Sequence, residues 1–180
     1  MDFIDEGIIL SARAHGENHA VADLFTAAHG RWAGLVHGGQ GRRMRPILQA
    51  GNEVRAEWKG RLNESLGHFT LELPDAHAGE LMQDRLSLAA LTAACAIASA
   101  CLPERETHPA AFTAMRILIA NLDQPEIWPA LMARWSFWAA RRTWFRADAR
   151  PLRRDRSAGK PRLCFAEIGL RGLGGGRRSV

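Results

Sequence analysis

Residues Gly30–Gly51 read GRWAGLVHGGQGRRMRPILQAG, and this stretch decides the fold of the first part of the chain. A short apolar run opens it and gives way to a glycine-rich segment that carries Arg42, Arg43 and Arg45. A second apolar patch then runs up to Gly51. Because glycines and clustered charges favour loops while apolar and β-branched runs favour strands, the pattern predicts a strand, a mobile basic loop and a return to a strand.

Outward from this loop, short apolar runs and period-two alternation indicate five strands. We expect them at Gly7–Ala12, Ala20–Thr26, Arg31–His37, Asn52–Lys59 and His68–Leu73. In the last two, apolar and polar residues alternate, which places Trp58 and Phe69 on the buried face. The short connections predict antiparallel pairing, and closure into a small barrel would remove the exposed edges. A fragment of a β-sandwich is the alternative.

Beyond Ala76 the apolar residues recur at three- and four-residue steps, which is typical of amphipathic helices. The stripes run from Leu88 to Leu102, from Phe112 to Leu122 and from Leu131 to Trp138. Pro109 and Pro129 stand where helices begin, and Pro103 where one has ended. The sequence therefore predicts an α+β chain with a barrel at residues 1–76, a helical domain of three or four helices at 77–140 and a basic tail at 141–180.

Charge is unevenly spread along the chain. Met1–Trp138 carries 12 Lys+Arg against 16 Asp+Glu, whereas Ala139–Val180 carries 12 against 3. The formal net charge of +5 thus belongs to the tail and is a weak argument about the partners of the folded part.

The candidate binding residues are the cations gathered around the basic loop, in a stretch whose only acids are Glu53 and Glu57. They are Arg31, Arg42, Arg43, Arg45, Arg55, Lys59 and Arg61. On adjacent strands and loops they would form a stripe that follows a phosphate backbone; an ordinary solvated face is the alternative. Trp32 could stack a base, but we expect it in the core.

Other chemistry finds little support in the sequence. No Lys-Ser/Thr follows the loop glycines, so a nucleotide-binding P-loop is not indicated. The seven histidines lack metal-ligand spacing, no Gly-x-Ser-x-Gly elbow occurs, and Cys95 and Cys101 lie on an apolar helix. With neither an export signal nor a membrane span, we expect a cytoplasmic, non-enzymatic protein with no cofactor, metal, membrane partner or small-molecule substrate.

The joint order of six short motifs, between about Asp5 and Trp135, resembles the bacterial RecO family of recombination mediators in DNA repair. The motifs are Gly16-Glu17, Leu24-Phe25-Thr26, His29-Gly30-Arg31, Gly34-Leu35-Val36, Leu48-Gln49-Ala50-Gly51 and Leu102-Pro103-Glu104-Arg105. The resemblance implies an N-terminal OB-fold followed by helices, and no metal, because the zinc-binding cysteines of some members are missing.

In function, the resemblance implies binding of single- and double-stranded DNA and annealing of complementary strands at the nucleoid. It also implies work with RecR and the single-strand-binding protein SSB in loading the RecA recombinase, in the RecF pathway. From the residues alone, an RNA- or ribosome-associated OB module and an enzyme with an unrecognised site remain alternatives.

The resemblance ends after Trp135. Related chains continue through a Gly-Phe-Gly-Leu turn, a Cys-Ala-Val-Thr-Gly segment and a Tyr-Val-Ser-Pro run, whereas Arg141–Arg178 is rich in arginine and glycine. Thr143–Arg156 can be encoded so that reading from the second base of the first codon gives PGFGLTLARCAVT. Arg156–Gly169 can likewise give GARENPDYVSPKSG.

We therefore expect a truncated helical domain and a tail that is disordered or out of frame. Such a truncation would leave Trp135 and Trp138 without partners. A genuine basic tail that adds non-specific DNA affinity is the alternative.

Overall fold

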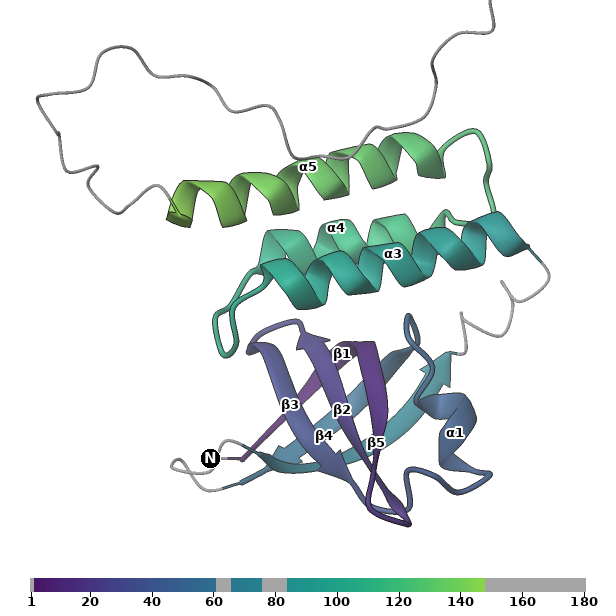
Figure 1. Ribbon diagram of the computed structural model, residues 1–180, viewed down its shortest axis with the longest axis vertical. Helices are drawn as coiled ribbons and strands as arrows, with labels where there is room; N and C mark the ends of the chain where they lie inside the picture. Colours follow the sequence, from purple (N-terminus) through teal and green to yellow (C-terminus); the bar gives the residue numbers. More distant parts are fainter. Residues whose placement is uncertain (1, 61–65, 76–83, 148–180) are drawn as a thin grey trace, which may run out of the picture. The chain divides into compact units, whose positions relative to one another are not determined.

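A computed structural model of the chain describes residues 2–60, 66–75 and 84–147 (Figure 1). Its strands are β1 Asp2–His15, β2 His19–Thr26, β3 Gly30–Val36, β4 Glu53–Lys59 and β5 Gly67–Asp75. Its helices are α1 Met44–Ile47, α3 Arg85–Cys101, α4 Pro109–Ala120 and α5 Trp128–Ala147. The boundary that we expected between barrel and helices, after residue 76, lies outside the described residues. The tail was expected from residue 141, but α5 continues to Ala147, and residues 148–180 lie outside the described residues.

All five expected strands are present, and β1 is longer at both ends than the sequence suggested. Its first half pairs with β4, from Asp2 opposite Lys59 to Ile8 opposite Glu53. Its second half pairs with β2, as far as His15 opposite His19. Acidic residues at the start of the chain concealed this strand: Asp2 and Glu6 are exposed, whereas Asp5 is partly buried and its carboxylate accepts a hydrogen bond from the Ala28 N–H at 2.7 Å.

The five strands form a closed barrel in the order β1-β2-β3-β5-β4. Neighbours are antiparallel except β3 and β5, which are parallel from Gly34 opposite Gly67 to Val36 opposite Phe69. Uniform antiparallel pairing was therefore a wrong expectation, because the chain passes through α1 and β4 before β5 closes the barrel. Closure excludes the sandwich fragment, and five strands in this order form an OB-fold.

Aromatic rings fill the interior of the barrel. Trp58 is 1% exposed and Phe69 3%, so both predictions of core position are confirmed. Trp32 is also buried, and its indole N–H donates to the carbonyl oxygen of His29 at 2.8 Å. Phe3 stacks on Trp58 with ring centroids 5.7 Å apart. These rings belong to one buried cluster inside the barrel, together with aliphatic side chains such as Ile9 and Leu24.

The apolar patch before Gly51 differs from the expected strand. Met44–Ile47 forms one helical turn, α1, and Leu48 after it is buried among the barrel residues. The side-chain amide of Asn52 donates to the carbonyl oxygens of Pro46 at 2.8 Å and Ile47 at 3.1 Å. Because proline cannot donate to a strand ladder, the segment covers the barrel as a capped turn instead.

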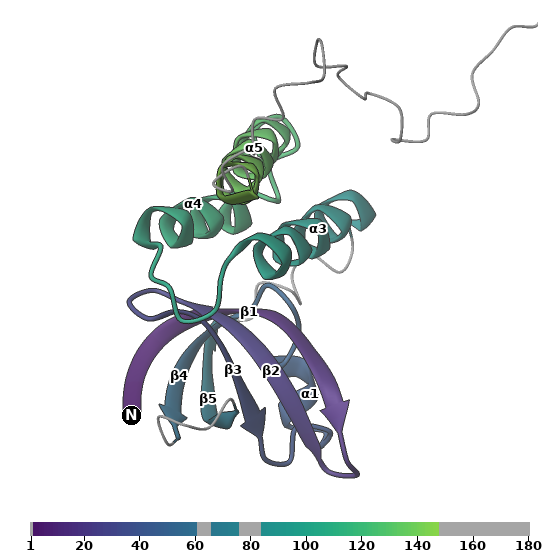
Figure 2. The same cartoon turned by 60° about the vertical axis from the view of Figure 1, so that its left-hand side comes forward.

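Helices α3 and α4 pack on the outer surface of β1 and β2, and α5 packs on α3 and α4, on the side away from the barrel (Figures 1 and 2). Ile8, Leu10 and Phe25 point out of the barrel into one cluster with α3, α4 and α5. Small residues on α3 allow close approach, and the Cys95 thiol donates to the carbonyl oxygen of Ile9 at 3.8 Å. The predicted apolar stripes are confirmed except at Leu88, which is 36% exposed.

The prolines stand where the sequence placed them, since Pro109 begins α4, Pro129 is the second residue of α5 and Pro103 follows α3. Trp135, however, does not lack partners. It is 2% exposed, and its indole N–H donates to the carbonyl oxygen of Ala94 at 3.4 Å. That expectation was wrong because α5 turns this side chain towards α3. No helix in the described residues is both long and apolar enough to span a bilayer.

Candidate nucleic-acid interface

Arg31, on β3, joins the barrel to the helices. One guanidinium nitrogen, Nη1, donates to the carbonyl oxygen of Ser99 and lies 3.7 Å from Asp23 Oδ2. The other, Nη2, lies 3.2 Å from Glu104 Oε1. The side chain is only 16% exposed. Arg31 could therefore bind a phosphate only by giving up these contacts.

The same junction explains part of the Leu102–Arg105 motif. The backbone N–H of Arg105 donates to the carbonyl oxygen of Arg31 at 2.8 Å, and the Arg105 guanidinium lies 4.7 Å from the centre of the Trp32 ring. Burial raises the pKa of Asp23 above its usual value, although Arg31 and a hydrogen bond from Ser99 both act to lower it. These contacts fasten the outer face of β2 and β3 to α3.

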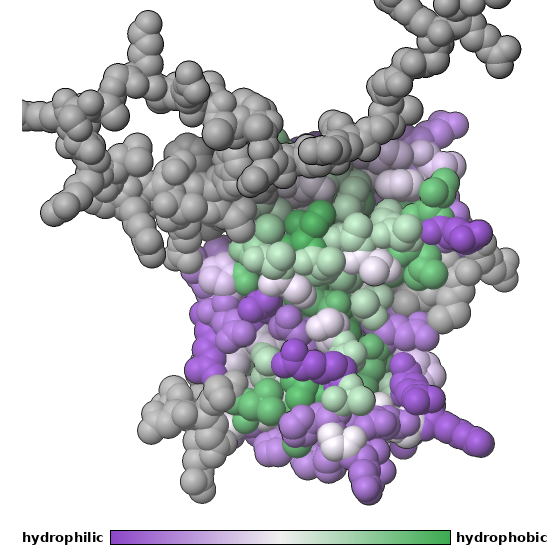
Figure 3. Space-filling view, in the orientation of Figure 1, coloured by the Kyte–Doolittle hydropathy of each residue, from purple (hydrophilic) through white to green (hydrophobic). Residues whose placement is uncertain are grey.

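The helices do not cover the whole of this outer face. Near the β2–β3 turn, Phe25 and Asp23 meet α3 and α4, as the ring contact of Phe25 with Phe112 and the hydrogen bond of Ser99 to Asp23 show. The β1–β2 turn lies at the end of the barrel away from these helices, in both views (Figures 1 and 2). Figure 3 shows weakly apolar side chains over α3 and hydrophilic ones along this lower end.

Four exposed arginines gather at this end, and we call them the basic end: Arg13, Arg42, Arg43 and Arg45. Arg13 on β1 and Arg45 on α1 line a shared hollow of about 220 Å³ beside Gln40. The Gln40 amide donates to the carbonyl oxygen of Gly16 at 2.8 Å and thereby ties the glycine-rich loop to the β1–β2 turn. The exposed carboxylate of Glu17 lies on the same turn.

Three of the predicted binding residues therefore lie together, and Arg13 joins them. No pattern in the sequence pointed to Arg13, because it lies in the first hairpin, far along the chain from the basic loop. Only the pairing of β1 with β2 and the fastening of the loop to their turn bring it to the same end of the barrel.

The remaining predicted residues lie elsewhere. Arg55 points outward from β4 and stands between Glu6 of β1 and Glu72 of β5 in the strand register. Lys59 Nζ lies 2.7 Å from Glu57 Oε1, and this hydrogen bond raises the lysine's pKa. Arg61 is outside the described residues.

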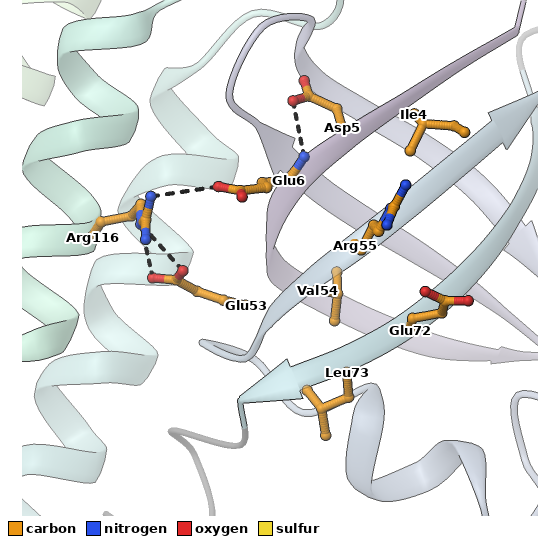
Figure 4. Close-up of a pocket in the computed structure, with 9 residues that line it drawn as sticks. All are labelled: Ile4, Asp5, Glu6, Glu53, Val54, Arg55, Glu72, Leu73 and Arg116. Carbon is orange, nitrogen blue, oxygen red and sulfur yellow. Dashed lines mark hydrogen bonds and ion pairs between the residues drawn. The ribbon is translucent and has the colours of Figure 1, made fainter.

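A larger hollow, of about 740 Å³, lies beside Arg55 at the junction with α4 (Figure 4). Arg116 reaches into it from α4, with Nη1 3.5 Å from Glu6 Oε2 and Nε 3.1 Å from Glu53 Oε2. Four carboxylates and two guanidinium groups line the hollow. That excess of negative charge disfavours a phosphate backbone here.

The described residues contain no cluster of three or more histidine, cysteine or acidic side chains that could hold a metal ion. Cys95 is buried, and desolvation raises the pKa of its thiol to about 12. Such a thiol stays protonated at neutral pH, as expected for a structural cysteine.

The closed five-stranded barrel with helices on one side places the chain in the OB-fold class, whose members include proteins that bind oligonucleotides or oligosaccharides. Comparison with known families agrees. The family model for the N-terminal part of recombination protein O matches residues 1–74, and the model for its C-terminal part matches residues 82–143. The chain belongs to the RecO family.

Relatives named DNA repair protein RecO support this assignment. The protein of Methylobacterium nodulans is 52% identical over 134 residues, which are 74% of this chain and 54% of the relative. That of Rhodospirillum centenum is 54% identical over 135 residues, 75% of this chain and 54% of the relative. That of Cereibacter sphaeroides is 45% identical over 148 residues, 82% and 61% respectively. The chain thus spans about half the length of these relatives.

Proposed function

We propose that this chain is a DNA-binding mediator of recombinational repair that breaks no covalent bond itself. It binds single- and double-stranded DNA through the basic end of its OB barrel and anneals complementary strands. With RecR and SSB it helps to load the RecA recombinase, in the cytoplasm at the nucleoid. Membership of the RecO family supports the pathway, and the exposed arginines of the basic end carry the proposal for DNA contact.

The physical basis is the release of counterions. Arg42, Arg43 and Arg45 are exposed, and no ion pair joins them to a described residue. A phosphate that binds them displaces condensed cations from the DNA, so affinity falls as salt rises. Of the seven predicted contacts, we keep these three for the phosphates and add Arg13. Arg31 positions the barrel, Arg55 and Lys59 contribute little, and Arg61 stays a prediction.

The test is the salt dependence of binding to a single-stranded oligonucleotide by the full chain. For single strands, log affinity falls as log salt rises, and each lost phosphate contact should reduce the steepness of this fall by about 0.7. R42A/R43A/R45A should therefore reduce it by about 2. R134A removes an exposed arginine from α5 and serves as the matched control. An unchanged slope in the triple variant would remove the basic end from the interface.

Two further assays test the preference for DNA over RNA and the annealing of complementary strands. Competition with RNA of the same sequence separates a DNA mediator from an RNA-binding OB module, because an RNA reader depends on the 2′-hydroxyl. An annealing assay on SSB-coated complementary strands tests the mediator role directly. Loss of annealing in the triple variant, with retention in R134A, is the expected result.

A further inference from the structure

Three histidine rings from different parts of the barrel meet on its outer surface. His19 begins β2, His37 directly follows β3, and His68 lies on β5. The rings of His37 and His68 are stacked, with centroids 4.9 Å apart and 13° between their planes. The rings of His19 and His37 also lie 4.9 Å apart, but nearly perpendicular, at 84°. Together they form a continuous aromatic surface.

This surface is not part of the core. His37 and His68 are exposed, and no hydrogen bond or ion pair ties either imidazole to another residue in the described part of the chain. His29 differs, because it stacks on Phe3 with centroids 4.0 Å apart and its Nδ1 lies 3.0 Å from Asp5 Oδ2. An exposed stack with so few internal contacts is available to a ligand.

The histidine stack lies next to the basic end. His37 is followed at once by the glycine-rich loop that carries Arg42 and Arg43, and Gln40 of that loop also donates to the carbonyl oxygen of His19 at 3.3 Å. In the register, His68 stands between Leu35 of β3 and Lys59 of β4. The stack therefore lies on the part of the outer face that the helices leave open, near the β1–β2 turn. OB-folds hold oligonucleotides on the strand 2–3 face and its adjoining loops.

We propose that His37 and His68 form a platform on which one base of single-stranded DNA stacks, while the basic end holds the neighbouring phosphates. This inference rests on the proposed function and adds the group that is recognised. Imidazole rings are among the side chains on which unpaired bases stack, and stacking tolerates any base sequence.

The geometry limits where the base can lie. A base between the two rings would need two stacking distances of about 3.4 Å each, more than the 4.9 Å between their centroids. The base must instead extend the stack on the outer side of His68, where no ring of another described residue makes contact. In a duplex the bases already stack on each other, so the platform favours single strands.

The experiment compares two probes that carry the same phosphate charge. One is a short oligo-dT, and the other has the same length but abasic sites in place of its bases. The full-length H37A/H68A variant should bind oligo-dT about tenfold more weakly and bind the abasic probe and duplex DNA like the wild type. The salt slope should stay the same, and H37F/H68F should restore the affinity for oligo-dT.

H15A is the matched control, because His15 is an exposed histidine opposite His19 whose ring contacts no ring of a described residue. Its ratio of oligo-dT to abasic affinity should equal that of the wild type. An unchanged ratio in H37A/H68A would overturn the platform, as would an equal loss on both probes. If the wild type bound neither probe, the proposed function itself would fail; if only the arginine variant changed binding, this inference alone would.

Discussion

Gly30 and Glu106 lie so close that a side chain on the glycine would collide with the backbone of the glutamate. A Cβ at Gly30 would come within 2.0 Å of the Glu106 carbonyl oxygen, and the glycine has a φ of +80°. The β2–β3 turn can therefore meet the loop between α3 and α4 only with glycine at this position.

We predict that G30A lowers the free energy of unfolding by about 3 kcal/mol, because it adds a steric conflict to the cost of a positive φ. G16A is the control, since Gly16 has a φ of +61° but no atom within 4 Å of its Cβ position. It should lose only about 1 kcal/mol. Urea unfolding measures both, and equal losses would show that the close approach is unimportant.

Arg31 supplies a second prediction, because its contacts are internal. R31A should lower the free energy of unfolding by about 2 kcal/mol, since it leaves Asp23 and the carbonyl oxygen of Ser99 without a charged donor. The salt slope of DNA binding should not change. K59A removes a cation from an exposed ion pair and should leave unfolding almost unaffected. A stable R31A variant with a reduced salt slope would place Arg31 on the DNA instead.

Arg13 and Arg55 separate the two sides of the barrel. Both are exposed arginines on strands, but Arg13 lies at the basic end and Arg55 stands between Glu6 and Glu72. R13A should lower the salt slope for single-stranded DNA by about 0.7, whereas R55A should leave it unchanged. Fluorescence anisotropy over a salt series gives both slopes. The reverse result would move the phosphate contacts to the part of the barrel where Arg55 stands between Glu6 and Glu72.

The sequence revealed the strands and helices where one face of an element is buried and the other is wet. Alternation placed Trp58 and Phe69 correctly, and three- and four-residue steps placed the helices. Alternation carries no information about which strands become neighbours, so the parallel pairing of β3 with β5 was missed. Contacts between distant segments also decide which cations are free. For that reason Arg31 was grouped with Arg42, and Arg13 was overlooked.

The buried Asp23 should make the free energy of unfolding depend on pH. Burial raises its pKa in the folded chain above the usual 3.8, so in the interval between the two values the folded state holds a proton that the unfolded state has lost. Asp23 therefore makes the free energy of unfolding fall as pH rises through this interval. D23N removes that contribution, so the difference between variant and wild type should shift in favour of D23N as pH rises.

Asp84 provides the opposite control. Hydrogen bonds from the Ser87 hydroxyl and the Leu86 N–H lower its pKa below 3.8, so its stabilising effect is present above that value and is lost as pH falls. D84N should therefore approach the wild type as pH decreases. Urea unfolding from about pH 3 to pH 7 measures both differences, and a flat D23N difference would argue against burial of an ionised Asp23.

The sequence of the tail indicates a shift of reading frame in the coding DNA. The match to the C-terminal RecO model ends at residue 143, and Thr143–Arg156 can be read one base later as PGFGLTLARCAVT. If the tail is out of frame, a single-base insertion or deletion lies near codons 136 to 143. Restoring the frame should raise the unfolding temperature, because new helical residues would cover apolar surface such as Phe137, which is 66% exposed. The control is a chain that ends after Ala147, which lacks both the present tail and the residues that the restored frame would encode. Independent genomic and transcript sequences with an intact frame through these codons would rule the frameshift out and leave a genuine basic tail.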